Sequence, residues 1–118
     1  HCPLTEHTRD LIDAEVLDAM KPSAFLINCA RGGIVNEQAL VDALKRGKIA
    51  GAATDVLSVE PPKQGNVLID ALNNDEIQNL IITPHSAWGS RDARQRIVDQ
   101  MLENLKAFQQ GTPIRQVN

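Results

Sequence analysis

Short apolar runs and amphipathic stretches alternate along the chain. Short apolar segments bounded by turn residues are typical of strands buried in a parallel sheet. Such segments cover residues 24–27, 49–54 and 79–83. Apolar residues three and four positions apart predict helices. These helices are expected at residues 14–20, 37–46, 67–72 and 91–110. Because strands alternate with helices, the pattern predicts right-handed βαβ crossovers and an α/β fold with a three-stranded parallel sheet.

Polar residues and glycines mark the ends of the predicted helices. Asp13, Asn36 and Ser90 precede the first, second and last helix, and we expect them to be N-caps. Gly47 and Gly111 follow the second and last helix, where glycine commonly ends a helix.

Composition leaves the fold prediction unchanged and argues against several partners. Hydrophobic residues make up 42% and aromatic residues 3% of the 118 residues, which predicts one domain with an aliphatic core. The net charge of −3 argues against nucleic acid or an anionic membrane surface as the main partner. No apolar run reaches the ~18 residues of a membrane-spanning helix, so no span is expected.

Cys2 and Cys29 lie far apart in the sequence and lack the spacing of a metal site. We expect reduced thiols in a cytoplasmic protein and no metal; a disulfide is the alternative. No signal peptide is visible, but the chain begins at His1 without an initiator methionine. We therefore expect it to come from a longer protein.

Polar side chains follow each predicted strand. Arg31 comes after the first strand, Asp55 after the second and His85 after the third. Glu60 lies in the loop after the second strand. The carboxyl ends of parallel strands share one edge of the sheet, where α/β folds bind ligands. We predict that Arg31, Glu60 and His85 lie on this edge, with the side chains of Glu60 and His85 in contact.

These residue types suit acid/base chemistry on a small anion. A carboxylate beside a histidine fixes the tautomer of the ring and favours its protonated form. Arg31 suits a carboxylate or phosphate, which it can bind through two parallel hydrogen bonds. The glycines that follow, Gly32 and Gly33, are expected to permit a sharp turn and the close approach of a ligand.

Each candidate also has a purely structural interpretation. Arg31 alone is compatible with a surface ion pair, and Glu60 with a solvated loop charge. Asp55 alone is compatible with a turn cap, and His85 with a hydrogen-bonded loop histidine. Cys29 is expected to be a small packing residue, because no base neighbours it in sequence. Their joint placement at strand ends favours a site.

Four segments in order carry a resemblance to a known family. They are HCPLT at residues 1–5, NCARGGIV at 28–35, the DV and EP pairs within 55–61, and TPH at 83–85. Over residues 1–110 the sequence resembles the D-isomer-specific 2-hydroxyacid dehydrogenases. The segment HSAW, which begins at His85, is most similar to the glycerate dehydrogenase branch, also called hydroxypyruvate reductases.

The resemblance implies a role for each candidate. Arg31 falls on the arginine that binds the carboxylate of a 2-oxo acid, His85 on the acid/base histidine, and Glu60 on its carboxylate partner. The implied cofactor is NAD or NADP, which exchanges a hydride with the substrate. Arg31 and His85 also adjoin this cofactor. Further nicotinamide and ribose contacts fall on Pro3, Thr8, Cys29, Ala30 and Asp55, with Asp55 at the carboxamide.

The resemblance also implies a part of a larger protein. Residues 1–110 correspond to the C-terminal half of an NAD(P)-binding Rossmann domain, a three-layer parallel sheet, including the return helix at 91–110; residues 111–118 form a tail. The phosphate-binding pattern GxGxxG is absent from the 118 residues. We expect the parent protein to be a homodimeric oxidoreductase acting on small 2-hydroxy acids, and the isolated chain to be inactive, with negligible NAD affinity.

Two other functions stay open. The family includes transcriptional corepressors that use the fold for protein contacts, so a protein-interaction module is one alternative. A dimerisation module without catalysis is the other. The joint presence of Arg31, Glu60 and His85 favours the enzyme. We also expect an unpaired edge at residues 24–27 and apolar positions within 91–110 to make the chain self-associate.

Overall fold

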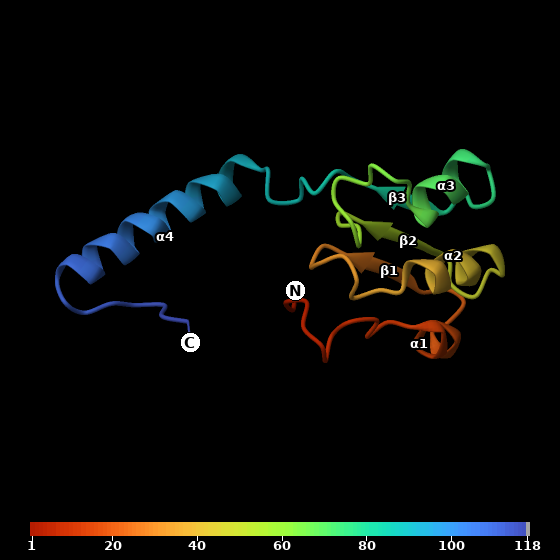
Figure 1. Cartoon of the computed structure of the whole chain (residues 1–118), viewed down its shortest axis with the longest axis horizontal. Helices are drawn as coiled ribbons and strands as arrows, with labels where there is room; N and C mark the ends of the chain where they lie inside the picture. Colours follow the sequence, from red (N-terminus) through yellow and green to blue (C-terminus); the bar gives the residue numbers. More distant parts are fainter. Residues whose placement is uncertain (118) are drawn as a thin grey trace. The chain divides into compact units, whose positions relative to one another are not determined.

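The computed structural model describes residues 1–117. The chain divides into two compact units, residues 1–85 and residues 86–118, and each is described by itself. Figure 1 shows that the first unit carries the sheet and the shorter helices, whereas the second carries one long helix. Among the helices of the described residues, none is long and apolar enough to span a bilayer.

The first unit alternates helices and strands, as the hydrophobic pattern predicts. Helix α1 (Ala14–Ala19) precedes strand β1 (Phe25–Asn28), and α2 (Glu37–Lys45) connects β1 to β2 (Gly51–Thr54). Helix α3 (Val67–Asn73) then connects β2 to β3 (Leu80–Ile82). The strands pair in parallel in the order β1-β2-β3, which confirms the α/β prediction.

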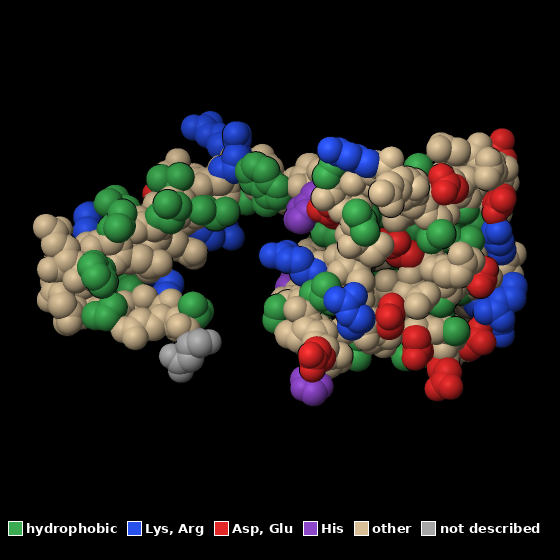
Figure 2. Space-filling view, in the orientation of Figure 1, with side chains coloured by type: hydrophobic (Ala, Val, Ile, Leu, Met, Phe, Trp, Pro, Cys, Tyr) green, Lys and Arg blue, Asp and Glu red, His purple; other side chains and the backbone are tan. Residues whose placement is uncertain are grey.

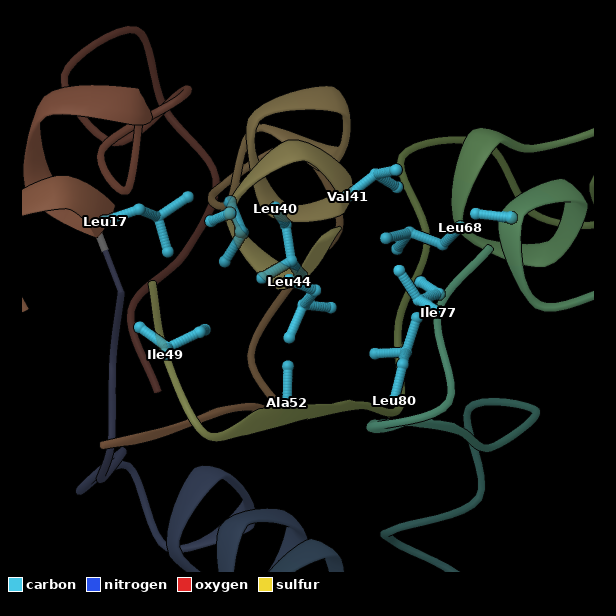
Figure 3. Close-up of a cluster of buried hydrophobic side chains, with 12 residues drawn as sticks. Leu17, Leu40, Val41, Leu44, Ile49, Ala52, Leu68, Ile77 and Leu80 are labelled. Carbon is cyan, nitrogen blue, oxygen red and sulfur yellow. The ribbon is translucent and has the colours of Figure 1, made fainter. Parts of the chain in front are cut away.

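The hydrophobic core lies on the face of the sheet that helices α1, α2 and α3 cover. Ala52 and Leu80 align across β2 and β3, and both belong to the buried cluster. In Figure 3 the labelled side chains fill the space between the strands and these helices. Leu17, Ile49 and Leu68 are the largest side chains that are fully buried. The core is therefore aliphatic, as the composition predicts.

The opposite face of the sheet is exposed. Phe25, Ile27 and Ile81 keep 69%, 70% and 65% of their surface accessible. Ile27 and Ile81 both align with Ala53 of the central strand, so they lie in one row across the sheet. The prediction of a buried strand at residues 24–27 is therefore wrong for this face. An apolar run does not reveal whether a second layer covers it.

The second unit contains helix α4 (Arg91–Gln109). Ser90 caps it as predicted, because its Oγ accepts a hydrogen bond from the N–H of Ala93 at 3.2 Å. Gly111 follows the helix with φ 73°. No residue of α4 is buried, and Figure 2 shows hydrophobic side chains all along this unit. The exposed apolar residues of the helix are Ile97, Val98, Met101, Leu102, Leu105 and Phe108.

The predicted helix starts match the observed ones, and the other boundaries differ by at most two residues. The N-cap predictions for Asp13 and Asn36 are confirmed, since both side chains accept hydrogen bonds from the first turn of their helix. β1 begins at Phe25 and β2 only at Gly51. A single parallel bridge between Ile12 and Val35 was not predicted, because a bridge of one residue pair leaves no periodic pattern.

Candidate active site

The three parallel strands β1, β2 and β3 lie side by side (Figure 1), and the predicted site residues follow them in the sequence. The register aligns the carboxyl ends of β1, β2 and β3 across the parallel sheet. Arg31 follows β1 by three residues, Asp55 follows β2 directly, and His85 follows β3 by three residues. The fold therefore brings these residues, which are distant in sequence, to one rim.

A buried asparagine shapes the loop that carries Arg31. The Asn28 side chain accepts a hydrogen bond from the N–H of Ala30 at 3.0 Å and donates one to the carbonyl oxygen of Arg31 at 3.1 Å. The Arg31 side chain is exposed, and its Nη1 donates to the carbonyl oxygen of Ala30 at 2.7 Å. A guanidinium carries five N–H donors, so this contact is compatible with binding an anion.

Gly32 lets the Arg31 loop touch the loop after β2. A Cβ atom on Gly32 would lie 1.8 Å from the carbonyl oxygen of Leu57 and 2.6 Å from the amide nitrogen of Ser58. A side chain has no room there, so this backbone contact requires glycine. The sequence predicted a close approach at the two glycines. At Gly32 the approaching group is the backbone of the loop after β2.

Asp55 connects the ends of all three strands. Its Oδ1 accepts a hydrogen bond from the Thr83 hydroxyl at 2.5 Å, and its N–H donates to the carbonyl oxygen of Asn28 at 2.9 Å. Asp55 is buried, with 5% of its surface exposed. Its carboxylate therefore lies under the rim, where it helps to hold the ends of β1 and β3 to β2.

Glu60 and His85 are in contact, as predicted. His85 Nδ1 lies 2.6 Å from Glu60 Oε2. Glu60 Oε1 accepts a hydrogen bond from the N–H of Leu57 at 2.7 Å. The backbone of the loop thus fixes one carboxylate oxygen while the other orients the imidazole. Both side chains remain partly exposed, His85 by 42% and Glu60 by 34%.

The backbone of His85 adopts a strained conformation. Its φ of 52° lies in the left-handed region, which costs a residue with a side chain about 1 kcal/mol. Its N–H donates to the carbonyl oxygen of Thr83 at 3.0 Å, which closes a tight turn around Pro84. Strained residues of this kind concentrate at functional sites.

The hydrogen bonds at Glu60 change its acidity. The bond from His85 is the largest influence, and together with the Leu57 N–H it lowers the pKa of the Glu60 carboxyl below its ordinary value. Partial burial and the negative charge of Asp55 act in the opposite direction but do not outweigh these bonds. Glu60 is therefore ionised at neutral pH and can accept a hydrogen bond from the Nδ1–H group of His85.

Two hollows lie beside the loops that follow the strands. The first, of ≈ 310 Å³, is bounded by His1, Cys2, Pro3, Cys29, Ala30 and Arg31. It therefore gathers four of the predicted cofactor contacts at one place. The second, of ≈ 340 Å³, is largely apolar and is bounded by Leu57, Glu60, Pro61, Pro62, Thr83, Pro84 and His85. The contacting pair Glu60 and His85 thus lines a different hollow from the one that Arg31 lines.

Thr8 lies outside both hollows. Its hydroxyl donates to the carbonyl oxygen of Pro3 at 2.7 Å and accepts from the N–H of Thr5 at 2.7 Å. The threonine therefore closes the turn that holds Pro3 in place. Its predicted contact with the cofactor stays a prediction.

Sequence reasoning missed two polar residues of the site. Thr83 binds Asp55, and Asn28 binds the Arg31 loop. Asn28 is the last residue of β1 and lies three positions before Arg31. Thr83 directly follows β3 and lies two positions before His85. That position was the available signal, but a threonine or asparagine at a strand end is common enough that it does not indicate a specific bond.

The comparison with protein families agrees with this geometry. The family described as the NAD-binding domain of D-isomer specific 2-hydroxyacid dehydrogenase matches residues 1–87. A glycerate dehydrogenase of Methylorubrum extorquens is 53% identical over 113 residues, which are 96% of this chain and 35% of the relative. A hydroxypyruvate reductase of Blautia hydrogenotrophica is 41% identical over 118 residues, which are 100% of this chain and 35% of the relative.

A solved structure shares the fold. The D-isomer specific 2-hydroxyacid dehydrogenase from Lactobacillus delbrueckii ssp. bulgaricus, in its NAD complexed form, matches with a TM-score of 0.82 and 35% identity over 100% of this chain and 38% of that chain. The present chain spans about a third of the length of these curated relatives. Since the family match covers most of the chain, the chain belongs to the D-isomer specific 2-hydroxyacid dehydrogenases, in the part described as their NAD-binding domain.

Proposed function

We propose that residues 1–110 form the C-terminal half of the NAD(P)-binding domain of a D-2-hydroxyacid dehydrogenase, with residues 111–118 as a tail. The observation that carries the proposal is the 2.6 Å contact between Glu60 and His85 at the carboxyl edge of the sheet. The proposed substrate pair is hydroxypyruvate and D-glycerate, because the glycerate dehydrogenase and the hydroxypyruvate reductase are close relatives of this chain.

His85 is the proposed acid/base residue. The Glu60 contact engages Nδ1, so we assign proton transfer to Nε2, the other nitrogen of the ring. Glu60 fixes the tautomer of His85 and stabilises the imidazolium that forms when the ring takes up a proton. During reduction of a 2-oxo acid, His85 gives its proton to the oxygen that becomes the hydroxyl.

Arg31 is the proposed ligand of the substrate carboxylate. Arg31 is exposed in the loop after β1, and the Asn28 side chain is hydrogen-bonded to the backbone of this loop. Two parallel hydrogen bonds to a carboxylate would fix the orientation of a small 2-oxo acid. The binding energy from this contact then places the carbonyl group for reaction.

We place the nicotinamide end of NAD or NADP at the hollow lined by Pro3, Cys29, Ala30 and Arg31. Its size and its position beside the proposed carboxylate ligand support this choice. When bound, the cofactor supplies or takes up the hydride. Thr8 would support this contact through its bond to Pro3, and Asp55 is the proposed partner of the carboxamide.

The test uses the natural protein that contains this segment, assayed for reduction of hydroxypyruvate with NADH and with NADPH. His85→Ala should lower kcat by roughly 10²–10⁴-fold, because it removes the proton donor. Arg31→Ala should act mainly on kcat/KM through lost carboxylate binding. His7→Ala, which changes a histidine of the N-terminal turn, is the matched control.

A parental rate for the His85 variant would overturn the proposal. In that case the protein-interaction or dimerisation alternative would be favoured.

Two further parts of the same proposal concern assembly and location: the protein acts as a homodimer, and it acts in the cytoplasm. Localisation of a tagged protein and its mass in solution check these two parts.

A further inference from the structure

Glu37, in the first turn of α2, binds the loop that carries Glu60. Its Oε1 accepts a hydrogen bond from the N–H of Ser58 at 2.7 Å. Its Oε2 accepts from the Ser58 hydroxyl at 2.8 Å and from the Asn66 side chain at 2.8 Å. One carboxylate therefore holds two points of the loop, one on each side of Glu60 in the sequence.

The bonds that Glu37 makes restrain the backbone next to the group that binds Glu60. Ser58 follows Leu57 directly, and the N–H of Leu57 is the group that binds Glu60 Oε1. Asn66 is buried and caps α3, so the far end of the loop is tied to the core. The same segment also contacts the Arg31 loop, where the backbone of Leu57 approaches Gly32 closely.

Helix α2 is a rigid support for this contact. Four of its side chains are buried in the core. Asn36 caps the helix one residue before Glu37, and its Oδ1 accepts a hydrogen bond from the N–H of Ala39 at 2.9 Å. Two of the donors to Glu37 are groups that only donate, a backbone N–H and an amide N–H. A carboxylate satisfies them with charge-assisted bonds, which are stronger than neutral ones.

We propose that Glu37 is a positioning residue, which holds the loop at residues 57–66 so that Glu60 stays against Nδ1 of His85. The inference deepens the proposed function, because it takes the Glu60–His85 pair to be the acid/base pair. Glu37 does not touch the hollow at His85 and acts only through the loop.

The tautomer of His85 reports this role without any turnover. A carboxylate only accepts hydrogen bonds, so a neutral ring held against Glu60 carries its proton on Nδ1. Nitrogen chemical shifts of the imidazole, measured at mildly alkaline pH in the natural protein that contains this segment, identify the protonated nitrogen. His85→Gln assigns the signal, because it removes only that imidazole.

Glu37→Ala should shift the His85 signal from the Nδ1–H form to a mixture of both tautomers. Ser58→Ala removes one of the three bonds and should give a smaller shift of the same sign. Asp42→Asn is the matched control, because Asp42 lies on the same helix and its side chain binds Gln38 rather than the loop. It should retain the parental spectrum.

An unchanged Nδ1–H form in Glu37→Ala would overturn the proposal. If Glu37→Ala does not fold, Ser58→Ala and Glu37→Gln decide it, and a parental tautomer in both would have the same meaning. Activity of the natural protein separates this inference from the proposed function. A tautomer shift with unchanged turnover would refute the catalytic role of the pair while leaving the positioning role intact.

Discussion

The Glu60 carboxylate accepts two hydrogen bonds, and both stabilise its ionised form. The His85 contact and the Leu57 N–H lower its pKa in the folded protein. A carboxyl group with a lowered pKa binds fewer protons when folded than when unfolded, so stability rises with pH through that range. The contribution is present above the unfolded pKa and is lost as the pH falls through the lowered folded value.

Glu60→Gln should therefore flatten the acid limb of the stability curve. The free energy of unfolding, measured by urea denaturation from neutral pH down through the pKa of a free glutamate, should depend less on pH than in the parent chain. His85→Gln should have a similar effect, because the His85 bond is the largest cause of the shift. Acid limbs that stay parallel in all three proteins would contradict this account.

Gly32 supports the rim by having no side chain. Gly32→Ala should destabilise the chain by about 2–3 kcal/mol, because the added Cβ would lie 1.8 Å from the Leu57 oxygen and backbone must move. Thermal or urea denaturation measures the loss. Gly47→Ala is the control: its Cβ meets nothing within 4 Å, and only its positive φ of 63° penalises alanine.

The two glycine variants should also differ in which resonances move. Gly32→Ala should displace the amide signals of Leu57 and Ser58, whereas Gly47→Ala should leave them in place. If both variants lose equal stability and neither disturbs Leu57, the backbone contact does not hold the loop.

Residues at the rim were predictable where topology alone decides their position. Arg31, Asp55 and His85 each follow a strand, and the parallel arrangement places them on one edge. The bonds made by Glu37 and Asn28 were not predictable, because they depend on the path of a loop rather than on a repeating pattern.

Among the secondary structure elements, α2 connects the core to the rim. Its N-cap Asn36 also reaches the N-terminal segment, since its Nδ2 donates to Asp10 Oδ1 at 3.2 Å. Asp10 in turn donates its N–H to the carbonyl oxygen of Gly33 at 2.8 Å. The start of the helix, the N-terminal segment and the glycine loop thus share one set of hydrogen bonds.

Asn36→Ala should cost about 1 kcal/mol of stability, the usual effect of removing an N-cap. Gln38→Ala is the control on the same turn, since its exposed bond to Asp42 should be worth only about 0.2–0.5 kcal/mol. Urea denaturation of both variants makes the comparison. A loss in Asn36→Ala no greater than in Gln38→Ala would mean that the cap does not stabilise α2.

The order of elements was predictable because helix and strand periodicities differ clearly in this sequence. Helix starts were predicted well, since caps are local side-chain bonds, as at Asp13 and Ser90. Burial of the strands was not, because Phe25 and Ile81 belong to apolar runs and yet lie on an open face. Sequence pattern reports which side chains are apolar, but not which surfaces meet.

At the scale of the whole molecule, each unit exposes an apolar surface that favours association with other chains. The first unit exposes Phe25, Ile27 and Ile81 on one sheet face, and β1 is an edge strand. The second unit exposes the apolar side chains of α4 from Ile97 to Phe108, and Figure 2 shows hydrophobic side chains on the surface of this unit. Exposed patches larger than a few hundred Å² mark interaction sites or aggregation-prone surfaces on soluble proteins, and an open edge strand is a template for another chain.

We therefore predict that the 118-residue chain self-associates at micromolar concentration, by pairing of β1 edges or by exchange of α4 between copies. Sedimentation velocity should give a mass above the 12.9 kDa of one chain. Leu105→Lys on α4 and Ile27→Lys on the sheet should each shift the distribution toward the monomer, because each places a charge on an exposed apolar surface. Gln95→Lys, at a polar position of α4, is the control and should leave the distribution unchanged. A monodisperse monomer for the parent chain would show that neither the edge nor the apolar faces drive association.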